Sequence, residues 1–157
     1  NPLSNVAMLA KIFLPKGARV LPLTSEAADY KLAGSAANAR LSDLHWPLDL
    51  VWLGMGADGH TASIFPGPDL EEAFDAKKDV RAIGVAPDPM PPEAPVNRVT
   101  LTANSICASR TTIVVINGAE KKQVLETAIE QGARSAFPVG KLFDRLTVPV
   151  DIYCLEN

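Results

Sequence analysis

The sequence predicts an α/β fold with three layers, in which a mainly parallel sheet lies between two layers of helices. Helical patterns and strand-length apolar runs alternate along the chain, and this alternation is typical of parallel sheets covered by helices. The apolar strand predicted for residues 48–53 runs directly into a loop with three glycines, an acid and a histidine. Open α/β sheets bind ligands at loops that follow the carboxyl ends of strands, so this segment also predicts a functional site.

Length and composition are those of a single globular domain over residues 1–157. Apolar residues make up 47% of the chain, which is enough for a substantial core. The net charge of −3 gives no support for nucleic-acid binding. No signal peptide and no run long enough to cross a membrane is visible, so we expect no membrane partner and a cytoplasmic location. The sequence carries no signal for an oligomeric state.

The first half of the chain predicts two helices with a short strand between them. Residues 5–14 carry apolar side chains on one helical face, and residues 19–23 have the pattern of a strand. An alanine-rich stretch at residues 26–41 predicts a long helix, which begins after Thr24 or Ser25. The buried central strand at residues 48–53 follows it.

The remaining predicted elements are short. In chain order they are a helical turn at 61–65 capped by Thr61, a helix at 70–74, a strand at 80–85, a proline-rich surface loop at 88–96, a strand at 98–101, a helix at 103–108, a strand at 112–116, a helix at 119–131 ended by Gly132, a turn or short helix at 138–145, and a strand at 148–153. The two cysteines, Cys107 and Cys154, are too few for a disulfide scaffold, and their apolar neighbours predict buried free thiols.

Residues 54–59 read Gly-Met-Gly-Ala-Asp-Gly and fit the dinucleotide-binding pattern G-x-G-x-x-G. In that motif a helix starts at once, and its positive end holds a pyrophosphate. Here Asp58 would place negative charge against the phosphate, and Pro66 and Pro68 would end any helix after one or two turns. We therefore reject the nucleotide interpretation.

The stretch from Gly54 to Gly67, Gly-Met-Gly-Ala-Asp-Gly-His-Thr-Ala-Ser-Ile-Phe-Pro-Gly, closely resembles the signature of 6-phosphogluconolactonases. These enzymes belong with glucosamine-6-phosphate deaminases and ribose-5-phosphate isomerases in one wider group. Three further segments agree in order with the family, namely residues 3–5, 97–102 and 117–121. Members of the family begin with a segment that carries a Gly-Gly-Ser phosphate loop and an Asp-Glu-Arg motif. Neither occurs here, so the chain resembles the C-terminal two thirds of such an enzyme, truncated at its N-terminus.

His60 and Asp58 are the predicted catalytic pair. A neutral imidazole can take a proton from water near neutral pH, as lactone hydrolysis requires. Asp58 can orient that imidazole, or it can hold the tight loop by accepting hydrogen bonds from backbone amides. In the deaminases that the chain resembles, the matching acid takes part in proton transfer. The backbone amides between Gly56 and His60 can stabilise an oxyanion, so Gly56 and Gly59 are predicted to contact the substrate.

Arg98 and Lys121 are the predicted cations for an anionic substrate, since arginine offers a planar fork and lysine a mobile charge. Lys121 lies in the first turn of a predicted helix, where free amides and the helix dipole also favour an anion. The resemblance implies that both positions contact a phosphosugar. It also places Asn5 at the edge of the site, whereas Ser4 has an ordinary role as a helix cap.

Other reactive residue types have no partners in the sequence. His45 precedes the central strand and is assigned no role. Ser63 and Thr61 lack a second base that would make them nucleophiles. Histidines and cysteines are scattered, without zinc spacing, so no metal site and no cofactor is predicted.

The resemblance implies hydrolysis of 6-phospho-D-glucono-1,5-lactone to 6-phosphogluconate, a step of the oxidative pentose phosphate pathway. Two alternatives stay open. One is an amino-sugar phosphate deaminase or isomerase of the same fold. The other is a non-catalytic fragment that binds sugar phosphates, because the glycine–serine loop and the Asp-Glu-Arg segment are absent.

Overall fold

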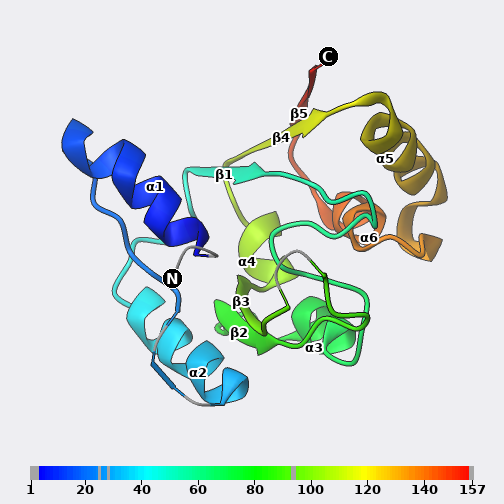
Figure 1. The fold of residues 1–157 in the computed structure, drawn as a ribbon. Helices are drawn as coiled ribbons and strands as arrows, with labels where there is room; N and C mark the ends of the chain where they lie inside the picture. The colour runs from blue at the N-terminus through cyan, green and yellow to red at the C-terminus, as the bar shows by residue number, and fades with distance from the viewer. Residues whose placement is uncertain (1–3, 25, 28, 93–94, 156–157) are drawn as a thin grey trace.

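A parallel three-stranded sheet forms the centre of the fold. The computed structural model describes residues 4–24, 26–27, 29–92 and 95–155. Strands β1 (Leu50–Leu53), β4 (Thr111–Asn117) and β5 (Val150–Leu155) lie in the order β1-β4-β5, and both pairs are parallel. The carboxyl ends of these strands therefore meet at one edge of the sheet, where the loop after β1 begins (Figure 1).

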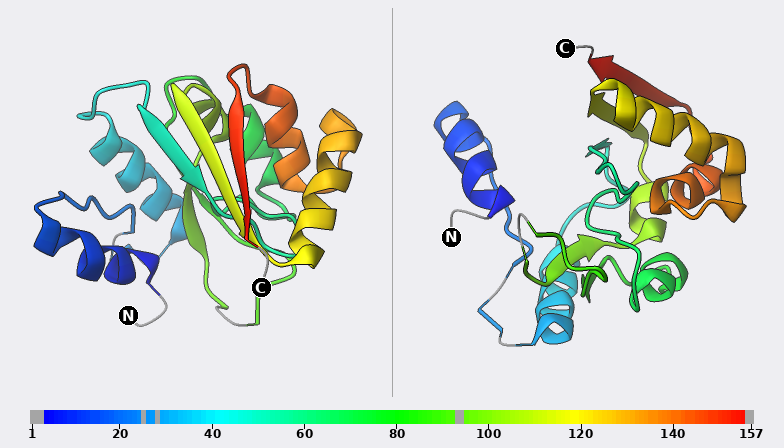
Figure 2. Two further views of the ribbon diagram at one scale, coloured as in Figure 1. Left: turned by 90° about the horizontal axis from the view of Figure 1, so that it is seen from above. Right: turned by 45° about the vertical axis from the view of Figure 1, so that its right-hand side comes forward.

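One face of this sheet is covered by helices α5 (Ala119–Gln131) and α6 (Pro138–Arg145) and by the short helix α4 (Ala103–Cys107) (Figure 2). Side chains along β4 alternate, so that every second residue points into this layer. The resulting core contains fully buried apolar side chains from each element: Val114, Ile106, Ala128, Val139 and Leu142. The 3-10 turn η2 (Gly132–Arg134) links α5 to α6.

A second, smaller sheet pairs β2 (Ala82–Val85) with β3 (Arg98–Leu101) in antiparallel fashion. Helix α2 (Tyr30–Leu41) packs against it, with Ala37 and Leu41 buried beside Ala82. Helix α3 (Leu70–Asp75) lies next to α4 and β2. The predicted strands at 80–85 and 98–101 are thus confirmed as strands, but they do not join the parallel sheet.

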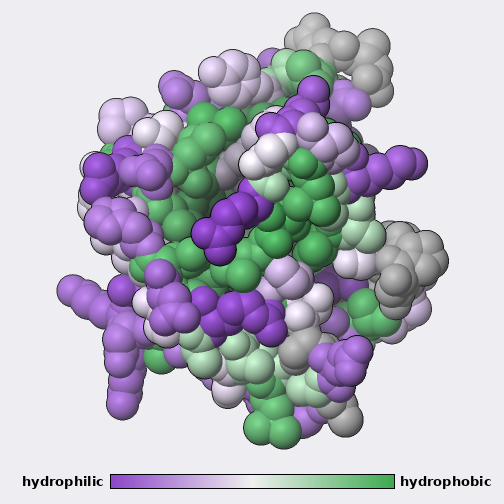
Figure 3. Space-filling model, turned by 90° about the vertical axis from the view of Figure 1, so that its left-hand side faces the viewer, coloured by the Kyte–Doolittle hydropathy of each residue, from purple (hydrophilic) through white to green (hydrophobic). Residues whose placement is uncertain are grey.

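The opposite face of the parallel sheet is open and apolar. Leu50 and Trp52 of β1 point to this side and are 52% and 65% exposed. Across the gap lies helix α1 (Asn5–Phe13), followed by the 3-10 turn η1 (Leu14–Lys16). No residue of α1 is buried. Figure 3 views this side of the molecule and shows hydrophobic side chains gathered in a hollow that hydrophilic side chains surround.

The predicted α/β fold with a parallel sheet between helical layers is confirmed, and most predicted elements occur within two residues of their expected bounds. Four predictions about these elements were wrong. Residues 48–53 were expected to form a buried central strand, but β4 is the central strand, β1 lies at an edge of the described sheet, and Leu50 and Trp52 are exposed. Residues 19–23 form no strand, because Pro22 lacks an amide donor and no described strand pairs with them. Helix α2 starts at Tyr30 instead of residue 26, because the side chain of Asp29 accepts the amide of Leu32 and caps the helix there. The alternative cap Ser25 lies outside the described residues.

Residues 61–65 form no helical turn. Thr61 instead makes isolated β-bridges to Met55 and Ile64, and Ala62 has a positive φ of 53°. Two smaller expectations also failed. Ser4 stands at the N-terminal cap position of α1, but its side chain makes no capping bond. Cys107 and Cys154 are free as predicted, but neither is fully buried: Cys107 is partly buried and Cys154 is exposed.

Among the described residues, no helix combines the length and the apolar character that a membrane crossing requires.

Candidate active site

The loop after β1 is folded back on itself as a compact hook. Thr61 pairs with Met55 and with Ile64 through β-bridges, and its hydroxyl donates to the carbonyl of Gly54 over 2.8 Å. The amide of Gly56 donates to the carbonyl of His60 over 3.0 Å, which closes the tip. Thr61 is only 1% exposed. The loop therefore presents its tip residues from a rigid, hydrogen-bonded base.

Two neighbouring elements hold this hook in place. At the tip, the carbonyl of Gly59 accepts the amide of Val139 in the first turn of α6 over 3.0 Å. Gly59 has a φ of +74°, and a Cβ at this position would lie 2.6 Å from the ring of Phe137, so only glycine fits. Where the chain returns from the tip, the amide of Ser63 donates to the hydroxyl of Thr100 on β3 over 3.1 Å.

At the tip of the hook, His60 and Asp58 form a hydrogen-bonded pair. The Nδ1 atom of His60 lies 2.6 Å from Oδ1 of Asp58, and the same oxygen accepts the backbone amide of His60 over 3.2 Å. Asp58 therefore contacts both the loop backbone and the imidazole, so each predicted role has a matching contact. When Nδ1 carries the proton that it donates to the carboxylate, Nε2 is left as a proton acceptor.

The position of this pair depends on the absence of a side chain at Gly56. A Cβ on Gly56 would collide with the imidazole of His60 and with the carboxylate of Asp58. The amides of Gly56, Gly59 and His60 are all engaged in hydrogen bonds within the loop. Within the described part of the chain, the amides of Ala57 and Asp58 have no such bond, so these two are the tip amides that remain for a ligand.

Phe65 packs against the imidazole from the base of the hook. Its ring is stacked on that of His60, with centroids 4.0 Å apart and an interplanar angle of 24°. The guanidinium carbon of Arg98 lies 6.0 Å from the centroid of the Phe65 ring. Phe65 is 7% exposed, whereas the side chain of His60 is 26% exposed. The imidazole is thus supported on one side and open on another.

A cavity of about 1520 Å³ lies between this loop, the open face of the sheet and α1. It brings together most of the residues predicted from the sequence: Asn5, Gly56, Asp58, His60 and Lys121. Arg98 and Gly59 are not among the residues that line it, although Arg98 reaches Phe65, which does line it. His45 is exposed and outside the cavity.

Both polar and apolar side chains line the cavity. Lys121 enters it from the first turn of α5, and His60 and Asp58 from the loop. Apolar side chains of α1 and β1 line much of the rest: Met8, Leu9, Ile12, Phe13, Leu50 and Trp52. Sites for small ligands commonly have volumes of roughly 300–1000 Å³, so this cavity is larger than a phosphosugar requires.

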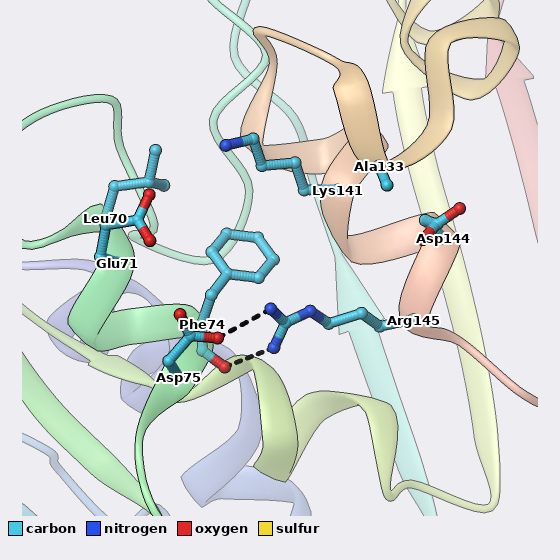
Figure 4. A pocket seen from close by; sticks show the side chains of 8 residues that line it. All are labelled: Leu70, Glu71, Phe74, Asp75, Ala133, Lys141, Asp144 and Arg145. Carbon is cyan, nitrogen blue, oxygen red and sulfur yellow. Dashed lines mark hydrogen bonds and ion pairs between the residues drawn. The ribbon is translucent and has the colours of Figure 1, made fainter.

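A second cavity of about 140 Å³ lies between α3 and α6 (Figure 4). Arg145 crosses it and donates to the carbonyl of Phe74 and to the carboxylate of Asp75, over 2.9 Å in the latter bond. Lys141 and Glu71 also line it. None of the predicted site residues does, and the cavity is too small for a sugar phosphate.

Thiol and metal chemistry have little support in the described residues. Burial raises the pKa of Cys107 to about 11, against a smaller opposing effect of Arg145, so its thiol is protonated at neutral pH. The described part of the chain contains no group of three or more histidine, cysteine, aspartate or glutamate side chains arranged for a metal ion. The acid–imidazole pair is the reactive arrangement that the cavity contains.

The sequence did not predict the supporting residues Phe65, Phe137 and Thr100. Each contacts the loop from a position that is distant in sequence or lies beyond a turn, so no local spacing reveals it. For Phe65 a partial signal existed, because it is the first large aromatic residue after the histidine.

Comparison with known proteins identifies the family of this chain. Residues 1–147 match the family described as glucosamine-6-phosphate isomerases/6-phosphogluconolactonase. A 6-phosphogluconolactonase of Mesorhizobium japonicum is 35% identical and is matched over 98% of this chain and 63% of its own length. One from Rhizobium meliloti is 36% identical, over 98% of this chain and 66% of its own length. The chain thus spans just under two thirds of these curated relatives.

Solved structures show the same similarity. A 6-phosphogluconolactonase from Shewanella baltica superposes with a TM-score of 0.81 at 27% identity, covering 95% of this chain and 63% of that one. The enzyme from Trypanosoma brucei gives 0.66 at 32% identity, covering 87% and 55%. A monomeric glucosamine-6-phosphate deaminase shares the fold, with a TM-score of 0.60 at 19% identity over 84% of this chain and 54% of that one.

A family match over residues 1–147, relatives at 35–36% identity and similar solved structures all agree on the family. The chain belongs to the glucosamine-6-phosphate isomerase/6-phosphogluconolactonase family.

Proposed function

We propose that this chain carries the hydrolytic centre for 6-phospho-D-glucono-1,5-lactone, with residues 1–157 acting as one domain. The observation that carries the proposal is the 2.6 Å contact between His60 Nδ1 and Asp58 Oδ1 at the rim of a large cavity. Curated relatives with this activity in their names cover almost the entire chain. The whole reaction is a proposal, because the chain spans less than two thirds of their length.

His60 acts as a general base on water. Asp58 holds the proton on Nδ1, so Nε2 can take a proton from a water molecule as its oxygen attacks the lactone carbonyl carbon. The tetrahedral intermediate collapses when the bond from this carbon to the ring oxygen breaks. His60 then returns its proton to the departing oxygen, so one water is added across the ester bond. This route uses neither a covalent intermediate nor a cofactor.

Negative charge develops on the carbonyl oxygen during the attack. The amides of Ala57 and Asp58 are the donors proposed for it, since the other amides at the tip already have partners. Gly56 and Gly59 then contribute mainly by letting the loop and the pair adopt this geometry. Their direct contact with substrate stays a prediction.

The phosphate is proposed to bind at the cationic side of the cavity. Lys121 lines it from the first turn of α5, where the N-terminal amides of the helix also favour an anion. Asn5 lines the cavity from α1. Arg98 supports the site through Phe65, and contact between Arg98 and the phosphate requires its side chain to reach past that ring. A cytoplasmic location stays an expectation from the sequence.

The direct test incubates the purified protein with freshly prepared 6-phospho-D-glucono-1,5-lactone and follows product through a coupled 6-phosphogluconate dehydrogenase assay. The spontaneous rate without protein is the baseline. Turnover above this baseline is expected. Ammonia release from glucosamine 6-phosphate would instead indicate the deaminase that the shared fold leaves open. Binding of 6-phosphogluconate without turnover of either substrate would indicate a non-catalytic sugar-phosphate-binding chain.

A further inference from the structure

The Asp58 carboxylate alone does not fix the orientation of the His60 ring. A single hydrogen bond at Nδ1 restrains one atom, while rotation about the bond to the ring is broad and roughly two-fold for histidine. A general base needs its free nitrogen held close to the attacking water, and small displacements reduce the rate strongly. A second contact that restrains the plane of the ring is therefore required.

The stacked ring of Phe65 provides this second contact. Its centroid lies 4.0 Å from that of the imidazole, and the two planes differ by 24°. A flat surface at this distance opposes tilting of the imidazole, and Asp58 opposes its flip. Asp58 engages Nδ1, so Nε2 is the ring nitrogen that faces away from Asp58. The His60 side chain that carries it lines the cavity.

Phe65 is itself firmly held. On one side, the amide of Ile64 donates to the carbonyl of Thr61 over 2.8 Å, and on the other the carbonyl of Pro66 accepts the amide of Asp88 over 3.2 Å. The guanidinium of Arg98 lies over the Phe65 ring at 6.0 Å. Phe65 is 7% exposed, and the backbone on both sides of it is hydrogen-bonded. Its ring can therefore serve as a fixed surface for His60.

We propose that Phe65 is a positioning residue, whose ring holds the His60 ring in the orientation that the proton transfer uses, while Asp58 sets the tautomer. The inference rests on the proposed lactone hydrolysis for its effect on rate. Its structural part is independent of the reaction, because the stack and the ring orientation are properties of the protein without substrate.

The test compares Phe65→Leu, which removes the ring but keeps apolar volume, with Phe65→Tyr, which keeps the ring. Phe74→Leu is the matched control. Phe74 is also buried and also lies under an arginine, Arg145, whose guanidinium carbon is 5.0 Å from the ring centroid, but it does not touch His60. Any general loss of stability from deleting a buried ring appears in both leucine variants.

The first readout is the ¹⁵N and ¹H NMR spectrum of the His60 ring without substrate, at a pH at which the ring is neutral. In the unchanged protein and in Phe65→Tyr, the proton is expected on Nδ1 and the ring protons are shifted by the stacked ring. In Phe65→Leu that shift disappears and the signals of the His60 ring broaden, because the ring samples other orientations while Asp58 keeps the proton on Nδ1. Phe74→Leu leaves the signals of His60 in place. Identical His60 spectra in the unchanged protein and Phe65→Leu would overturn the inference.

The second readout is steady-state lactone hydrolysis. Phe65→Leu is expected to lower kcat about 10- to 100-fold with little change in KM, and Phe65→Tyr to restore most of it. An altered His60 spectrum with unchanged kcat would overturn the positioning role. If the unchanged protein hydrolyses no lactone but its His60 spectrum depends on Phe65 as expected, then the proposed function fails while the placement of the ring by Phe65 stands.

Discussion

Nδ1 of His60 lies 2.6 Å from Oδ1 of Asp58, and this carboxylate oxygen also accepts the backbone amide of His60. One oxygen thus fixes both the main chain and the ring of the same residue. The side chain of Asp58 is 51% exposed and that of His60 26% exposed. Because both side chains are partly exposed, an ion pair between them adds little stability. The main effect of Asp58 is to orient the imidazole.

Asp58→Asn keeps the shape of the acid but lets its amide group donate to Nδ1, which favours the wrong tautomer of His60. We expect kcat for lactone hydrolysis to fall about 100-fold or more, with a similar KM. Asp49→Asn is the control, since the side chain of Asp49 is 84% exposed and pairs with Arg110. Equal loss in both variants would indicate a general effect of charge.

Gly56→Ala would drive a methyl group into the space that His60 and Asp58 occupy. The pair must separate, so we expect kcat to fall at least about tenfold while the protein remains folded. Gly54→Ala is a control within the same loop, because the nearest atom to its Cβ is 4.0 Å away. Turnover and thermal unfolding are measured together, and an active Gly56→Ala variant would show that the pair is dispensable.

Lys121→Ala removes the cation that lines the cavity from α5. A hydrogen bond to a charged group contributes about 1.5–3 kcal/mol, so KM should rise roughly 10- to 100-fold with a smaller change in kcat. Lys122→Ala is the control, since the adjacent lysine is not among the residues that line the cavity. Equal KM values in the two variants would exclude Lys121 as a phosphate contact.

Asp69 links α3 to α2 and β2 and should make stability sensitive to acid. Burial alone would raise its pKa, but hydrogen bonds from Lys31 and from the amide of Ala86 outweigh this and lower the pKa below its ordinary value of 3.8. A carboxylate with a lowered pKa in the folded state stabilises above the ordinary value. That contribution is lost as the pH falls from about 3.8 towards the lower folded pKa.

Asp69→Asn is therefore expected to lower the free energy of unfolding at neutral pH by about 2 kcal/mol. The difference from the unchanged protein should shrink as the pH falls below about 4. Glu72→Gln is the control, because Glu72 bonds the same lysine but is half exposed and should matter little. Denaturant unfolding at several pH values measures both, and a pH-independent loss would contradict the assigned cause.

The sequence predicted the parts of the fold that depend on local pattern. The alternation along β4 and the glycine-rich loop with Asp58 and His60 were recognisable because period and residue type reveal them. Residues 19–23 and 61–65 were mispredicted because their conformation depends on partners. Local propensity favours a strand at residues 19–23, but no described strand pairs with them. It favours a helical turn at residues 61–65, but Thr61 pairs with Met55 instead.

The sequence identified most of the residues that line the candidate site, but not the residues that support them. Gly56 reads as a flexible residue, and only the structure shows that its missing side chain makes room for His60. Phe65 reads as core, and its stack on the imidazole is visible only in three dimensions. Arg98 and Lys121 look alike in sequence, yet only Lys121 lines the cavity.

The central claim is that His60 activates the water that opens the lactone ring. The most direct measurement is the rate of 6-phospho-D-glucono-1,5-lactone hydrolysis above the spontaneous rate, for the unchanged protein and for His60→Ala. His60→Ala is expected to lose at least about 100-fold in kcat while substrate binding largely survives. Unchanged turnover in His60→Ala would contradict it.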